Sequence, residues 1–166
     1  MGLSTAAAVG RLTRVQDPAG LLYGALVAAS VLATSATHGS YGYVVLATLL
    51  VLAVYWLAHV YIEAQALQLH GDARRYVHLL GHTAVREASV IQGGLPAIVV
   101  YAVSNVLGAT AKEAAAIAVY FSVGVLFVVG FVTARIAGRT GLATWVDAVA
   151  ASLLGVAVIV AKALLH

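Results

Sequence analysis

Two ionisable side chains interrupt an otherwise apolar stretch of the sequence, YWLAHVYIE at residues 55–63. His59 and Glu63 are four residues apart, so in a helix they lie one turn from each other on the same face. A histidine with an ordinary pKa of about 6.5 can exchange protons with a neighbouring carboxylate in the physiological range. Histidines and carboxylates inside a membrane are the usual parts of proton relays. The pair therefore indicates a protonatable path or a cation site.

Polar side chains at the ends of other apolar segments fall at a depth close to that of His59 and Glu63. This placement assumes that each apolar segment crosses the membrane once. The polar side chains are those of Glu87, Gln92, Arg135 and Asp147. Together the six side chains form a predicted polar cluster in one half of the membrane.

The sequence leaves three interpretations of this cluster open. The first is structural: ion pairs, such as Arg135 with Glu63 or Asp147, would lock the helices together. The second is a pathway or binding site for protons or a cation. The third is a metal ion, which is the one possible cofactor, since imidazole and carboxylate ligands suit zinc, iron or manganese. The candidate metal ligands are His59, Glu63, His70, His78 and His82.

The composition is not that of an ordinary soluble domain. Of the 166 residues, 63% are hydrophobic and 9% are charged, and the mean hydropathy is +1.01. A soluble domain carries about 25% charged residues. The chain has no cysteine, which excludes disulfides and thiolate ligands. The net charge of +3 is scattered between apolar segments without a concentrated basic face, so no nucleic-acid partner is predicted.

Five apolar segments are each long enough, or nearly so, to cross a bilayer as a helix, which takes roughly 17–25 residues. Their continuous apolarity is typical of helices, because the strands of a membrane barrel alternate between apolar and polar residues. The segments are residues 20–36, 43–66, 88–107, 114–134 and 142–165. The predicted fold class is all-α, an integral membrane bundle of five transmembrane helices. We expect a multi-pass protein of a bacterial inner (plasma) membrane, with the lipid bilayer as its first partner.

The gaps between the segments are short turns, apart from residues 67–87. The centre of that gap, residues 73–82, predicts a short interfacial helix between the second and third transmembrane helices. The predicted organisation is a cytoplasmic N-terminal segment at residues 1–19 and a single transmembrane helical domain at residues 20–166.

Basic residues are unevenly divided between the two sides of the membrane. Seven fall on the side of the N-terminus: Arg11, Arg14, Arg74, Arg75, Arg86, Arg135 and Arg139. Two, Lys112 and Lys162, fall on the other side. Because cytoplasmic loops carry an excess of Lys and Arg, the N-terminus is predicted to be cytoplasmic and the C-terminus to lie outside.

One alternative concerns the first segment. Arg11 and Arg14, an apolar run and then Thr34-Ser35-Ala36 match a secretory signal peptide with a weak cleavage site. The apolar run of residues 20–36 is longer than the usual 7–15 residues of a signal core, which favours a retained helix.

Small residues recur at helical spacing in several segments. Lipid is as apolar as leucine, so helices in a membrane associate through close approach at small residues. Pro96 follows Gly93 and Gly94 and predicts a kink, where freed carbonyl groups are an alternative set of ion ligands. The predicted packing positions are Gly20, Gly24, Ala28, Gly124, Gly130, Ala151 and Gly155.

Motifs of phosphate binding and hydrolysis are missing: the sequence has no G-x-x-x-x-G-K-[ST], G-x-S-x-G or H-E-x-x-H. Enzymatic activity is therefore not favoured. The segments YWLAHVY (55–61) and VIVAKALLH (158–166) resemble those of small uncharacterised actinobacterial integral membrane proteins. The resemblance implies a compact bundle of four or five spans, and it draws attention to His59 and Lys162.

The sequence favours a small proton or cation transporter, or a component of a channel. His59 and Glu63 would relay protons or bind the ion, with Glu87 and Asp147 as supporting carboxylates and Arg135 as a counter-charge. Five transmembrane helices give little protein around a proton or cation pathway, so a homo-oligomer is expected. The alternatives are a non-catalytic subunit or scaffold that docks a larger membrane partner, and a membrane-embedded His/Glu metalloprotein.

Overall fold

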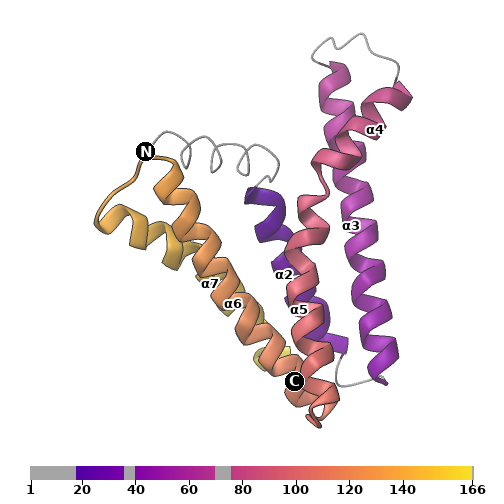
Figure 1. Cartoon of the computed structure of the whole chain (residues 1–166), viewed down its shortest axis with the longest axis vertical. Coiled ribbons are helices and arrows are strands. Elements are labelled where there is room, and N and C mark those ends of the chain that lie inside the picture. Colours follow the sequence, from indigo (N-terminus) through magenta and orange to yellow (C-terminus); the bar gives the residue numbers. More distant parts are fainter. Residues whose placement is uncertain (1–17, 36–39, 70–75, 166) are drawn as a thin grey trace, which may run out of the picture.

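The chain folds into an open bundle of helices (Figure 1). The computed structural model describes residues 18–35, 40–69 and 76–165, and all secondary structure in these ranges is helical. The helices are α2 (Pro18–Ser35), α3 (Tyr41–Leu69), α4 (Tyr76–Arg86), α5 (Ser89–Val106), α6 (Ala111–Ile136) and α7 (Leu142–Leu165).

Five helical stretches in the described ranges are long and apolar enough to cross a membrane. They are Pro18–Ser35, Tyr41–Leu69, Leu79–Val106, Ala111–Ile136 and Leu142–Ala161. The prediction of an all-α chain with five such helices is confirmed. Which end faces the cytoplasm, and whether α4 lies at the membrane surface, stay predictions.

Helix boundaries follow local chemistry. At the start of α6 the Thr110 hydroxyl accepts a hydrogen bond from the backbone N–H of Glu113, and the Glu113 carboxylate accepts one from the backbone N–H of Thr110 at 2.9 Å. This reciprocal capping box satisfies two N–H groups that the first turn leaves free. Gly108 follows α5 with φ of +97° and Gly138 follows α6 with φ of +78°. Glycine adopts such values without strain, so it can end both helices.

Helices α2 and α5 form the centre of the bundle, in contact with each other along their length. Among the 18 most apolar consecutive residues of each stretch, 39% are buried in Pro18–Ser35 and in Leu79–Val106, which contains α5, against 17% in the stretches of α3 and α7, which lie outside them. The two helices approach closely because their contact is made of glycine. A Cβ atom on Gly24 would lie 1.8 Å from the carbonyl oxygen of Val90, and one on Gly93 would lie 2.2 Å from that of Leu21.

The remaining small residues lie as follows. Gly20 faces Ser89, and Ala28 is fully buried in the core. Gly130 lies against Ala151, so α6 and α7 approach each other closely there, and Gly155 lies against Val123 and Leu126. Gly124 differs, because a Cβ atom placed on it would meet nothing within 4 Å. It therefore does not contribute to packing within this chain.

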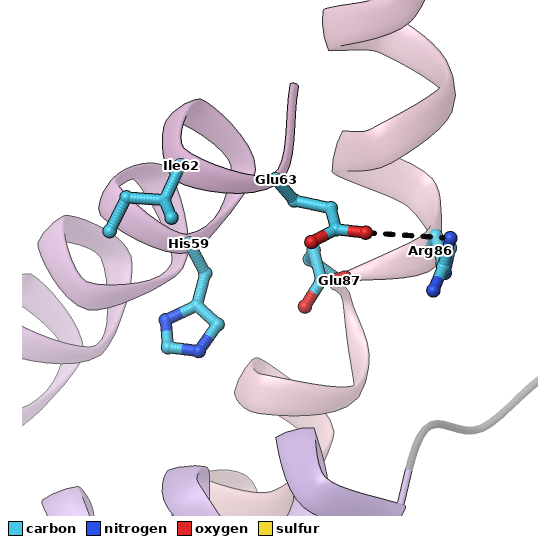
Figure 2. A pocket seen from close by; sticks show the side chains of 5 residues that line it. All are labelled: His59, Ile62, Glu63, Arg86 and Glu87. Carbon is cyan, nitrogen blue, oxygen red and sulfur yellow. Dashed lines mark ion pairs between the residues drawn. The ribbon is translucent and has the colours of Figure 1, made fainter. Parts of the chain in front are cut away.

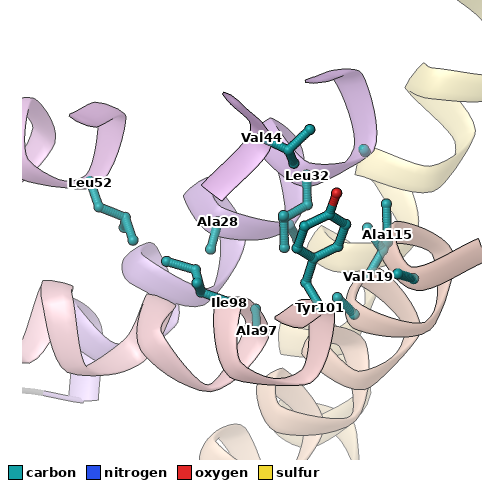
Figure 3. Close-up of a cluster of buried hydrophobic side chains, with 13 residues drawn as sticks. Ala28, Leu32, Val44, Leu52, Ala97, Ile98, Tyr101, Ala115 and Val119 are labelled. Carbon is teal, nitrogen blue, oxygen red and sulfur yellow. The ribbon is translucent and has the colours of Figure 1, made fainter. Parts of the chain in front are cut away.

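The hydrophobic core lies at the end of the bundle that is lowest in Figure 1, where α2, α3, α5 and α6 meet. Figure 3 shows its side chains gathered around Tyr101, which is fully buried. The Tyr101 ring stacks on Tyr41 with ring centroids 5.7 Å apart and an interplanar angle of 12°. The core therefore ties α3 to the bundle at this end.

At the opposite end, α3 extends beyond the central helices and α4 turns back along it (Figure 1). The 29 residues of α3 make a helix of about 43 Å at about 1.5 Å per residue. The indole N–H of Trp56 on α3 donates a hydrogen bond to the carbonyl oxygen of Ala84 on α4 at 3.2 Å. That bond fixes α4 beside α3, and so positions the residues at the end of α4.

The interruption of the third apolar segment does not fall at the proline. Pro96 lies inside α5, which is helical through it to Val106. The helix instead ends and restarts at Glu87 and Ala88, between α4 and α5. There the N–H of Ala88 donates to Val85 at 3.4 Å and the N–H of Val90 donates to Glu87 at 3.1 Å, which are tightened, 3₁₀-type bonds. Glu87 therefore lies at a break between two helices.

Candidate functional site

A pocket of about 250 Å³ lies where α3 faces the break between α4 and α5. His59, Ile62 and Glu63 line it from α3, Arg86 lines it from the last turn of α4, and Glu87 lines it from the break. Figure 2 shows the Glu63 carboxylate directed toward Arg86, with the side chain of Glu87 beside it and the His59 ring on the other side of the hollow. Two carboxylates, a guanidinium group and an imidazole ring thus border one hollow in a largely apolar chain.

Glu63 and Arg86 form an ion pair across the pocket, with Oε1 and Nη1 3.7 Å apart. The side chains are 37% and 56% exposed, so water screens their attraction. Such exposed pairs contribute about 0–1 kcal/mol to stability. The pair is therefore a weak link between α3 and α4 that can open at little cost.

Glu87 differs from Glu63 because it is almost entirely buried, with 5% of its surface exposed. Burying a carboxylate costs several kcal/mol unless other groups compensate for the lost water. Because Glu87 is buried and lies at a helix break, it is not an ordinary charged surface residue.

The imidazole of His59 belongs to a group of three rings. Its centroid is 4.9 Å from that of Tyr55 and 5.5 Å from that of Tyr23 on α2. The two tyrosine rings are 6.3 Å apart. These spacings are within the range of favourable ring contacts, so the rings hold His59 in a defined position at the pocket wall.

A second ionic group lies where α6 ends and α7 begins. Arg139 Nη1 donates a hydrogen bond to Asp147 Oδ1 at 3.0 Å. The hydroxyl of Thr144 donates to the carbonyl oxygen of Arg139 at 3.0 Å, which closes the same turn. Arg135 lies over the ring of Phe131, with Cζ 5.9 Å from the centroid. This group connects consecutive helices and stabilises the turn between them.

Five of the six side chains expected in one polar cluster are divided between two places, and Gln92 lies in neither. His59, Glu63 and Glu87 line the pocket, whereas Arg135 and Asp147 lie on α6 and α7. The central helices α2 and α5 separate α3 from the α6–α7 pair, and the two arms diverge at this end of the bundle (Figure 1). The ion pairs also differ from those expected for Arg135, because Glu63 pairs with Arg86 and Asp147 with Arg139.

The other predicted site residues do not join the pocket. Gln92 is exposed on α5. His82 is exposed on α4, and His70 and the side chain of His78 lie outside what the structure describes. Among the described residues, no group of three or more His, Asp or Glu side chains is placed to hold a metal ion.

Arg86 is the charged pocket residue that the sequence did not single out as part of a site. Its partner Glu63 is 23 positions away in the chain, so no helical spacing connects them. The signal that could have found it is the adjacent pair Arg86-Glu87 at the start of an apolar segment. An acidic and a basic residue there predict a site of contact with charges on a neighbouring helix.

No family model, curated protein or solved structure matches this chain. The likeness to small actinobacterial membrane proteins therefore stays a prediction. The five apolar helices are compatible with an integral membrane protein. Its function has to be argued from the pocket.

Proposed function

We propose that this protein is a small membrane transporter or channel component that moves protons or a cation, and that the pocket beside α3 is its binding site. The observation that supports this most is the convergence of His59, Glu63, Arg86 and Glu87 on one hollow. Ionisable residues in membrane segments are costly, and they commonly mark ion paths. The pocket is open and its ion pair is loose, so these groups are accessible to an ion.

The position of the pocket supports an entry site more than a midpoint. His59 is 18 residues from the start of α3, which is about 27 Å along its axis, and Glu63 is a turn further. The hydrocarbon core of a bilayer is about 30 Å thick. If α3 begins near one surface, the pocket lies at the inner edge of the opposite surface, where an ion can enter from water.

The proposal is tested by ion flux in liposomes that contain the purified full-length chain. An internal pH-sensitive dye reports proton entry when a potassium gradient and valinomycin set the membrane potential. We expect flux above that of protein-free liposomes, and we expect Glu63→Gln to remove it, because glutamine cannot take up a proton or balance a cation.

Glu113→Gln is the matched control for this experiment. It makes the same change of charge at the start of α6, outside the pocket, and glutamine can still complete a capping box. Flux must survive in this variant. Flux equal to that of protein-free liposomes for protons, sodium and potassium alike would refute the proposal.

A docking role is a second candidate, supported by a different observation. Phe121, Gly124, Val125, Val128 and Val129 line an apolar hollow of about 360 Å³ on the outer face of α6. Gly124 leaves open space there, as in contacts where helices of separate chains approach closely. Gly124→Leu would fill the hollow. A smaller complex after this change, measured by light scattering in detergent, would support a subunit role.

A further inference from the structure

Two of the buried hydroxyl groups in the described part of the chain are satisfied within their own helices, whereas those of Thr83, Ser89 and Tyr101 have no partner. The hydroxyl of Thr48 donates to the carbonyl oxygen of Val44 at 2.7 Å, and that of Ser122 donates to Ala118 at 2.8 Å. Both residues are almost fully buried. Bonding to the preceding turn is the ordinary solution for a serine or threonine in an apolar helix.

Thr83 on α4 departs from this pattern. It is 1% exposed, and its Oγ1 has no hydrogen-bond partner in the part of the chain that the structure describes. Ser89, the first residue of α5, is 2% exposed and also lacks a partner for its hydroxyl, which lies against Gly20. The two orphaned hydroxyls flank the helix break that holds Glu87. Leaving a buried polar group unsatisfied costs about 1–3 kcal/mol, so a missing partner is the simplest explanation.

Thr83 and Glu87 are placed to act together. Thr83 lies in α4 and Glu87 directly follows its end, four residues on, and the N–H of Glu87 donates to the carbonyl oxygen of Thr83 at 2.8 Å. The break joins the C-terminal end of α4 to the N-terminal end of α5, so the dipoles of the two helices offset each other there. A carboxylate and a hydroxyl both offer oxygen ligands, which suits a hard cation and not an anion.

The same features favour a monovalent ion over a divalent one. Calcium takes six to eight oxygen ligands, usually with several carboxylates, and magnesium keeps octahedral geometry. Here Glu87 is the buried carboxylate, and Arg86 contributes a positive charge beside it. In transporters, broken helices in the membrane provide the ligands of coupling ions such as sodium.

We propose that the break between α4 and α5 binds a sodium ion, with the Glu87 carboxylate and the Thr83 hydroxyl as ligands and the pocket as the route of entry. The inference rests on the proposed function in that it names the cation that the pocket handles. Arg86 would then set the affinity by repulsion. Its ion pair with Glu63 partly neutralises that charge.

The test is the thermal unfolding of the purified full-length chain in detergent, in sodium chloride and in choline chloride of equal ionic strength. A ligand that binds only the folded state stabilises it in proportion to the logarithm of its concentration. We expect the unfolding midpoint to rise with sodium and not with choline. Thr83→Val, which keeps the shape of the side chain and removes the hydroxyl, should abolish the rise.

Thr48→Val is the matched control, since that threonine is equally buried but already bonded in its own helix. The sodium effect must persist in this variant. No sodium-specific rise in the unaltered chain, or the same rise in Thr83→Val, would overturn the inference. The inference would also be overturned if Thr83→Val were more stable than the unaltered chain by the same amount in both salts. The hydroxyl would then be an unsatisfied buried group and not a sodium ligand.

The result of this sodium test can be told apart from the result of the flux test of the proposed function. Sodium-dependent stabilisation without flux of any ion would support a structural sodium site and refute transport. Proton flux without any sodium effect would refute the sodium site and leave the proposed function standing.

Discussion

Two ion pairs occur at the same end of this bundle, and they differ in nearly every respect. Arg139 and Asp147 are eight positions apart, bond at 3.0 Å and close a turn between consecutive helices. Glu63 and Arg86 are 23 positions apart, lie 3.7 Å from each other and border a pocket with the buried Glu87. The comparison shows that charges at one depth of a membrane protein need not share one purpose. A short pair within a hairpin stabilises the fold, whereas the loose pair between distant segments borders a hollow.

The largest expected effect comes from disrupting the close contact between α2 and α5, the helices that lie between the two ion pairs. Gly24→Ala places a methyl group 1.8 Å from a backbone oxygen of α5, so the helices must separate. Overpacking of this kind costs about 1–3 kcal/mol, and here no flexible side chain can move to relieve it. We expect a clear fall in the thermal unfolding midpoint.

Gly124→Ala is the control for that substitution. The added methyl group meets nothing within 4 Å, and alanine favours a helix over glycine by about 1 kcal/mol. Its unfolding midpoint should stay the same or rise slightly. If both variants behave alike, the glycine contact does not hold the bundle together.

A smaller effect is expected where α3 holds α4. Trp56→Phe keeps an aromatic ring and removes the donor to Ala84, at a cost of about 0.5–1.5 kcal/mol. Because α4 carries Arg86, ion flux should fall as well. Trp145→Phe on the other arm should leave flux unchanged. Equal flux in the two variants would show that the position of α4 does not control the pocket.

The smallest expected effect on stability comes from removing the ion pair between Arg139 and Asp147, and it tests the comparison of the two ion pairs most directly. Asp147→Asn removes an ion pair whose side chains are 55% and 33% exposed, so the expected loss of stability is at most about 1 kcal/mol. Flux should be unaffected, in contrast to Glu63→Gln. Loss of flux in Asp147→Asn would place the α6–α7 pair on the ion path and end the distinction between the two regions.

The fold was accessible from the sequence because apolarity alone decides which segments can cross a membrane. Even the ends of α6 and α7 fall within three residues of the predicted ones. The helix break was not accessible. Pro96 was the stronger local signal, yet a helix can continue through a proline when its neighbours pack closely. The break at Glu87 depends instead on α4 turning onto α3, which is a tertiary contact.

The sequence predicts how far along each helix the polar residues lie, but not which neighbouring helix each of them faces. Counting residues from the membrane surface put Asp147 and Glu63 at similar heights, and nothing in the count says on which side of the bundle each helix lies. That depends on which helices touch, and the glycine contact of α2 with α5 decides it. Arg86 was hidden for the same reason, since its partner Glu63 lies on a different helix.

The unequal lengths of the helices have a consequence for the lipid. The 18 residues of α2 extend about 27 Å, which matches the hydrocarbon thickness, whereas the 29 residues of α3 extend about 43 Å. A bilayer that matches α2 is too thin for all of α3, so α3 tilts, extends beyond the surface or stretches the surrounding acyl chains, at fractions of a kcal/mol per Å. Thicker and thinner membranes will favour different tilts of α3. The length of the lipid tails therefore adjusts the helix that carries His59 and Glu63.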